Sequence, residues 1–185
     1  MIRELLQEAE TRMLAAVNAL DSDLATYRTG RASPSLLNRV TVEAYGTEVG
    51  LNQVAVISVP EPQQLAIRPY DENILAQIER AIMKSDIGIT PSNDGKIIRL
   101  NMPRLTEERR RELTKQVSRR VEEAKVAVRN IRRDILNDLR EFEREKLITE
   151  DDLREGQEDL QELTDNYIAR IDELGTQKES EIMEM

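Results

Sequence analysis

Three long stretches of the chain carry a narrow stripe of apolar residues at helical spacing, and this pattern constrains the fold most strongly. In the first stretch, residues 1–28, apolar side chains recur every three or four positions, as they do in a coiled-coil seam. The same period returns over residues 106–142 and again over 153–174. A stripe this narrow cannot be buried by one helix alone, so we expect an elongated, antiparallel three-helix bundle.

Capping residues and helix breakers mark where these helices begin and end. Thr29-Gly30 should break the first helix. Thr106 is suited to cap the second, and Thr149-Glu-Asp-Asp152 resembles a capping box that opens the third. Gly156 and Gly175 lie inside the third helix. Each should cost about 1 kcal/mol relative to alanine there, so the two glycines predict weak points in this helix.

Residues 30–104 follow a different pattern, with all six prolines and five of the seven glycines. Helical spacing predicts a helix over 72–85, with Asp71 as its N-cap. Alternating or β-branched segments predict four strands, at 40–45, 54–59, 64–69 and 96–101. We therefore expect an α+β protein in which this stretch forms a small β/α/β domain.

The order of these segments makes the mixed domain, residues 30–104, an insertion in the bundle, residues 1–29 plus 105–185. The chain must then cross between the two domains twice, and two short stretches running side by side predict a hinge. The first connecting stretch of this hinge comprises Thr29, Gly30, Arg31 and Ala32, and the second comprises Pro103, Arg104, Leu105 and Thr106.

The amino-acid composition excludes several kinds of chemistry. The chain has no histidine and no cysteine, which rules out disulfides, thiolate metal sites and Cys or Ser–His nucleophiles. Asn93-Asp94-Gly95-Lys96 lacks the glycine spacing of a phosphate loop and predicts a tight turn. We find no catalytic constellation, metal site or cofactor motif, and so predict that the protein is not an enzyme.

No segment predicts contact with a membrane. The longest unbroken apolar run, Met13–Val17, is far shorter than the ~20 residues that span a bilayer. The first eight residues are charged and helical in pattern, which is unlike a signal peptide. We expect a cytoplasmic monomer.

Charge is unevenly distributed along the chain. The net charge is −9, but residues 104–133 carry 11 basic and 5 acidic side chains, whereas residues 134–185 carry 6 basic and 18 acidic ones. At ~100° per residue, one face beside the apolar stripe holds five of the basic residues of 104–133, with Arg132 nearer the seam. The members of this face are Arg111, Lys115, Lys125, Arg129 and Arg133.

This basic face has two explanations that the residues leave open. Some arginines should pair with the acidic third helix. Pairing of that kind would use the flanks of the seam rather than the outer face, which favours a polyanion there. Aromatic residues for base stacking are scarce, so recognition of the backbone and shape of a folded RNA or a duplex fits better. Arg28 and Arg31 add two guanidinium groups at the first crossing.

Four stretches of this chain resemble the bacterial ribosome recycling factor family. They are Arg28–Pro34, Lys84–Gly88, Leu105–Arg110 and Val126–Arg133. The resemblance spans the whole chain and implies an L-shaped arrangement of the bundle and the inserted domain. It also implies binding to the post-termination ribosome through large-subunit rRNA. With elongation factor G and GTP, such a protein splits the ribosome into subunits.

The resemblance assigns roles to particular residues of this chain. It gives Arg129, Arg132 and Arg133 the main role in RNA binding, with Arg28 and Arg31 beside them. Two competing hypotheses remain. One is a coiled-coil-like adaptor without an RNA partner. The other is a carboxylate hydrolase, which would need a pocket with raised carboxyl pKa values in the 30–104 domain.

Overall fold

The computed structural model describes residues 1–27 and 29–184, and they form two compact units. One unit comprises Met1–Arg28 and Thr106–Met185, and the other comprises Thr29–Leu105. Long helices build the first unit, whereas the second combines short strands with short helices. The predicted α+β fold, a helical bundle interrupted by a small mixed domain, is confirmed.

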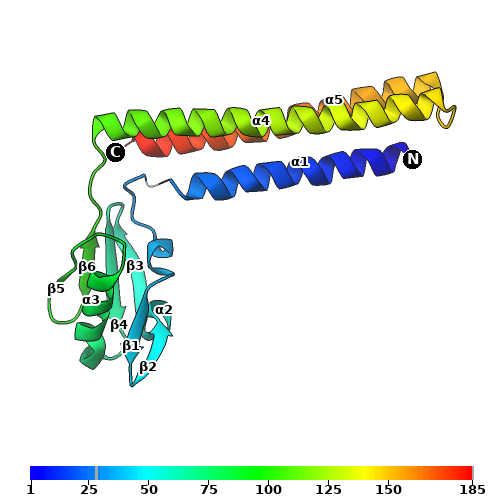
Figure 1. Ribbon diagram of the computed structural model, residues 1–185. Coiled ribbons are helices and arrows are strands. Elements are labelled where there is room, and N and C mark those ends of the chain that lie inside the picture. The colour runs from blue at the N-terminus through cyan, green and yellow to red at the C-terminus, as the bar shows by residue number, and fades with distance from the viewer. Residues whose placement is uncertain (28, 185) are drawn as a thin grey trace. The chain divides into compact units, whose positions relative to one another are not determined.

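Three helices build the first unit: α1 (Ile2–Ala25), α4 (Glu107–Arg144) and α5 (Glu150–Met183). Each packs against the other two. The connection between α4 and α5 is short and contains Lys146 at φ +60°, so α5 returns antiparallel to α4. Helix α1 begins at the end of the bundle where this connection lies (Figure 1).

The predicted apolar stripes form the core of the bundle. Buried side chains recur along each helix at spacings of three or four residues, which is the pattern of a coiled-coil-like seam. They include Leu5, Met13, Leu20 and Leu24 of α1, Val117, Val128, Ile135 and Leu139 of α4, and Leu160, Tyr167, Ile171 and Ile182 of α5.

The helix ends follow the capping chemistry of the sequence. The Thr106 hydroxyl accepts a hydrogen bond from the Arg109 amide at 3.1 Å. The predicted capping box is present: the Thr149 hydroxyl accepts from the Asp152 amide, and the Asp152 carboxylate accepts from the Thr149 amide. Helix α1 ends at Ala25 rather than near residue 28 because its last amides bond three residues back instead of four.

Helix α5 runs unbroken through both of its glycines, so the predicted weak points do not interrupt it. At Gly175 the reason is close packing, since a Cβ there would lie 2.7 Å from Cγ2 of Val121 on α4. The missing side chain lets the two helices approach. Tertiary packing thus holds the helix through a residue of low propensity.

The second unit contains six strands in two antiparallel sheets. A hairpin pairs β1 (Thr41–Ala44) with β2 (Thr47–Gly50), and the larger sheet has the order β3-β4-β6-β5. Those strands are β3 (Ala55–Glu61), β4 (Gln64–Pro69), β5 (Ser92–Asn93) and β6 (Ile98–Asn101). The helical segments are η1 (Pro34–Leu37), α2 (Leu51–Val54), η2 (Glu72–Ile74) and α3 (Leu75–Lys84).

One face of the larger sheet and helix α3 form the core of this unit. Leu65 and Ile67 of β4 alternate with exposed or half-buried neighbours, as the period of a strand requires. They belong to the same buried cluster as Ile78 and Ile82 of α3 and Leu100 of β6. The predicted strand at 64–69 has the bounds that the sequence indicated.

The structure corrects several predicted segments. Strands β2 and β5 were not predicted. The segment 40–45 stops at Ala44 because Tyr45 and Gly46 both take positive φ, the geometry of a two-residue hairpin turn. The predicted helix over 72–85 divides into η2 and α3. Asp71 caps the first of these two, accepting a hydrogen bond from the Asn73 amide at 3.0 Å.

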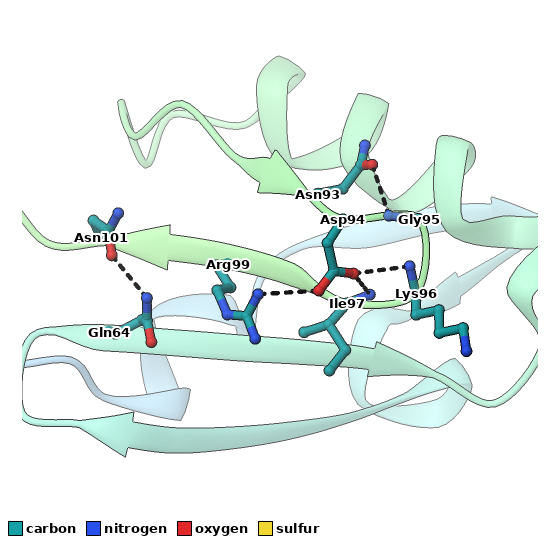
Figure 2. A network of polar contacts seen from close by, with 8 residues as sticks. All are labelled: Gln64, Asn93, Asp94, Gly95, Lys96, Ile97, Arg99 and Asn101. Atoms are coloured by element: carbon teal, nitrogen blue, oxygen red, sulfur yellow. Dashed lines mark hydrogen bonds and ion pairs between the residues drawn. The ribbon is translucent and has the colours of Figure 1, made fainter.

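The predicted tight turn at residues 93–96 is confirmed (Figure 2). One Asp94 oxygen accepts from the Lys96 amide at 3.0 Å and from the Ile97 amide at 2.9 Å. The other oxygen accepts from Arg99 at 3.1 Å. Because of this Asx-type turn, strand β6 begins at Ile98 rather than at residue 96, and the amides of the turn face a carboxylate. The loop is therefore not arranged to bind phosphate.

Candidate nucleic-acid interface

The outward side of helix α4 carries a row of basic residues. Buried residues such as Val117 and Ile135 define the side of the helix that faces the bundle. At ~100° per residue, four predicted RNA-binding residues lie roughly opposite that side, and all are exposed. We call these four the outer basic face: Arg111, Lys115, Arg129 and Arg133.

Within the described residues, the outer basic face forms no ion pair or hydrogen bond with another helix. Arg111 pairs with Glu107 at 2.5 Å, and Arg129 pairs with Glu122 at 3.3 Å. Arg133 donates to the Asn130 side chain at 2.8 Å. All these partners lie on α4 itself, and the Arg111 and Arg129 side chains remain 73% and 50% exposed. Surface pairs of this kind contribute little stability and are readily exchanged for a phosphate.

The other two predicted residues of α4 lie on the flank that faces α5. Lys125 forms an ion pair with Asp172 and is 20% exposed. Arg132 is half-buried, and its Nη1 donates to the Gln161 side chain at 3.0 Å. On the opposite flank, Arg120 binds Asp23 of α1 at 2.7 Å. The flanks thus hold the helices together, as expected of residues beside a seam.

Three further arginines on the outward side of α4 were not predicted. Arg119, Arg140 and Arg144 are exposed, and within residues 1–27 and 29–184 they make no hydrogen bond or ion pair. The same angular arithmetic would have found them. Arg140 and Arg144 were missed because they fall in the segment of net negative charge, where the sequence average hides them. Arg119 lies in the basic segment and was simply not assigned to the face.

The crossing residues have distinct structures. Arg28 lies outside the described residues, and Arg31 is an exposed residue of the second unit. Gly30 takes φ +79°, which explains a glycine there. The Ala32 amide, in the first crossing, donates to the Pro62 carbonyl at 2.7 Å, and the Met102 amide, just before the second crossing, donates to the Gln63 carbonyl at 2.7 Å.

The carboxylate-hydrolase hypothesis gains no support from the described residues of the mixed unit. A cleft of about 910 Å³ lies between the β1–β2 hairpin and α3, and it includes Glu43, Glu48 and Asp86. The carboxyl pKa values that are shifted in this unit are lowered, not raised. Tyr45 lowers the pKa of Asp71 by donating a hydrogen bond, and the Ile97 amide lowers the pKa of Asp94.

The described residues offer neither a carboxylate cluster for a metal ion nor a helix that could span a membrane. Residues 1–27 and 29–184 contain no cluster of three or more acidic side chains suited to hold a metal ion. Over the same residues, every helix is too polar or too short to span a bilayer.

Comparison with known proteins identifies the family. The family model for ribosome recycling factor matches residues 20–183. The chain belongs to the ribosome recycling factor family. Ribosome-recycling factors of Roseiflexus castenholzii and Halalkalibacterium halodurans are each 56% identical to it over 185 residues, which is 100% of both chains. This membership does not support the hypothesis of an adaptor without an RNA partner.

Solved structures of the same family share the fold. A solution structure of the ribosome recycling factor is 40% identical, covers 100% of this chain and 98% of its own, and has a TM-score of 0.74. A second structure contains the Thermus thermophilus factor and Escherichia coli elongation factor G bound to the post-termination complex. It is 42% identical over 99% of each chain, with a TM-score of 0.63.

Proposed function

We propose that this chain recycles ribosomes after termination by binding ribosomal RNA through the outer basic face of α4. Recycling is the function of the family to which the chain belongs. The observation that supports the RNA interface is the row of exposed cations on α4 whose partners all lie on α4. Such cations can exchange a local partner for a phosphate without opening the bundle, and arginine suits phosphate well.

The two flank residues differ in how well they suit RNA. The charge of Lys125 is neutralised by Asp172, so Lys125 mainly holds α5 in place. Arg132 instead binds a neutral amide, which leaves its positive charge uncompensated by that contact. Arg132 therefore remains in the proposed RNA site. Arg28 and Arg31 remain there as expectations from the family resemblance.

We extend the partnership seen in the related structure to this chain. That structure places a ribosome recycling factor with elongation factor G on the post-termination complex. In our proposal this chain acts there as a monomer in the cytoplasm and catalyses no reaction itself. GTP is hydrolysed by the elongation factor, and the crossings at 29–32 and 103–106 let the mixed unit move relative to the bundle.

Sucrose-gradient sedimentation of post-termination ribosomes tests this function. Subunits should appear only when the chain, elongation factor G and GTP are all present. Purified chain alone should not turn over GTP. Ribosomes that stay whole with all three components would contradict the recycling function. GTP turnover by the chain alone, abolished by a point substitution in it, would contradict a non-enzymatic role.

A further inference from the structure

A groove of about 480 Å³ lies between α1 and α5. Its apolar lining comes from Ile2 and Leu6 of α1 and from Gly156 and Leu163 of α5. Helix α1 and the connection from α4 to α5 meet at this end of the bundle (Figure 1). The groove therefore lies within one compact unit and on different helices from the outer basic face.

Carboxylates surround this apolar lining. Glu10, Asp152, Glu155 and Asp159 line the groove, against a single cation, Arg3. Glu155 and Asp159 are one helical turn apart and, within the described parts of the chain, have no ion pair or hydrogen bond. Like charges at this spacing destabilise a helix slightly. The rim thus concentrates negative charge that the described residues leave unneutralised.

Gly156 keeps the groove hollow, and packing alone does not require a glycine there. A Cβ at this position would lie 3.5 Å from Ile2 and from Leu139, which is ordinary van der Waals contact. An alanine would therefore fit and has the higher helix propensity. At Gly175, by contrast, a Cβ would lie only 2.7 Å from Val121. Of the two glycines of α5, only Gly156 lines the groove and could accept a methyl group without a close contact.

We propose that this groove binds an extended, cationic protein segment that carries an aliphatic side chain. The apolar lining would receive the aliphatic group, and Glu155 and Asp159 would bind lysine or arginine on either side of it. RNA is excluded because its phosphates would face carboxylates. The bundle would then hold RNA on α4 and a basic protein segment on α1 and α5. This second site goes beyond the proposed function and does not depend on it.

Fluorescence anisotropy with a labelled heptapeptide of alternating lysine and leucine tests the proposal. The full chain should bind this probe, and Gly156→Leu and Glu155→Lys should each weaken binding by about tenfold or more. Glu158→Lys is the matched control, because Glu158 is exposed on α5 but does not line the groove. It should change affinity by less than about twofold. Replacing the leucines of the probe by serine should also weaken binding.

Several results would overturn the proposal. They are no binding of the probe, equal losses for Glu155→Lys and Glu158→Lys, or parental affinity for Gly156→Leu. Circular dichroism checks each variant. If Gly156→Leu unfolds, Gly156→Ala replaces it, with a smaller expected loss and a stable helix. A dimer in sedimentation equilibrium that Glu155→Lys dissociates would show that a second copy occupies the groove, and would also overturn the proposal.

Discussion

Three carboxylates of this chain have pKa values that are lowered mainly by hydrogen bonds within the folded structure. The Tyr45 hydroxyl lowers the pKa of Asp71. Backbone amides do the same elsewhere, with Ile97 lowering the pKa of Asp94 and Thr149 lowering that of Asp152. Each carboxylate closes a turn or begins a helix, so the folded state favours its ionised form.

The Asp152 carboxylate should make stability depend on pH. Its pKa is lowered in the folded chain, so the ionised group stabilises the fold above its unfolded pKa of about 3.9. This contribution is lost as pH falls through the folded pKa. Asp152→Asn should therefore lower the free energy of unfolding in urea at pH 7, and the difference from the parent should shrink in acid.

The neighbouring Asp151 supplies the control for this prediction. Asp151→Asn removes the same charge from the first turn of α5 but leaves the capping box intact. It should have the smaller effect at pH 7. A difference between Asp152→Asn and the parent that stays constant from pH 7 to pH 3 would show that the carboxylate charge is not involved.

At the scale of elements, helix α5 shows how packing can reverse the effect of one substitution. Gly156→Ala should raise the free energy of unfolding by about 0.5–1 kcal/mol, since a methyl group fits there. Gly175→Ala should lower it, because the new Cβ would press on Val121, whose β-branched side chain is stiff in a helix. Urea denaturation of both variants measures these opposite signs.

A double substitution tests the cause at Gly175. Adding Val121→Ala should relieve the contact, so that Gly175→Ala becomes neutral or stabilising in that background. If Gly175→Ala lowers the free energy of unfolding by the same amount in the parent and in the Val121→Ala background, close packing against α4 is not the reason for the glycine.

The elements also show what a sequence can and cannot predict here. The three apolar stripes predicted the bundle because the helical spacing of apolar residues can be read within each segment, without knowing which helix it packs against. Strands β2 and β5 were missed because each is short and becomes a strand only through its neighbour. The outer basic face followed from angular spacing. The pairing of Lys125 with Asp172 and the packing of Gly175 depend on which residue of another helix lies opposite.

At the scale of the whole molecule, the bundle separates charge between its helices. The outward side of α4 is basic, whereas helix α5 carries 12 acidic side chains against 3 basic ones. This separation should orient the chain as it approaches RNA, because the acidic side is repelled. Two short crossings then connect the oriented bundle to the mixed unit.

The crossings should allow the two units to move as rigid bodies. The chain has no cysteine, so Lys96→Cys and Glu158→Cys together provide two unique labelling sites, one in each unit. Single-molecule energy transfer between them should show a broad distance distribution in free solution that narrows on the ribosome. A single narrow distribution, unchanged by ribosomes, would argue against a hinge.

The salt dependence of ribosome binding tests the RNA interface most directly. Arg129→Ala and Arg133→Ala should each weaken binding by about 1–3 kcal/mol. Each should also reduce the slope of log affinity against log salt by about one. Arg154→Ala, which removes an exposed arginine from α5, is the control and should leave both unchanged. If the double variant Arg129→Ala, Arg133→Ala pellets with ribosomes like the parent at low and high salt, the outer basic face is not the RNA site.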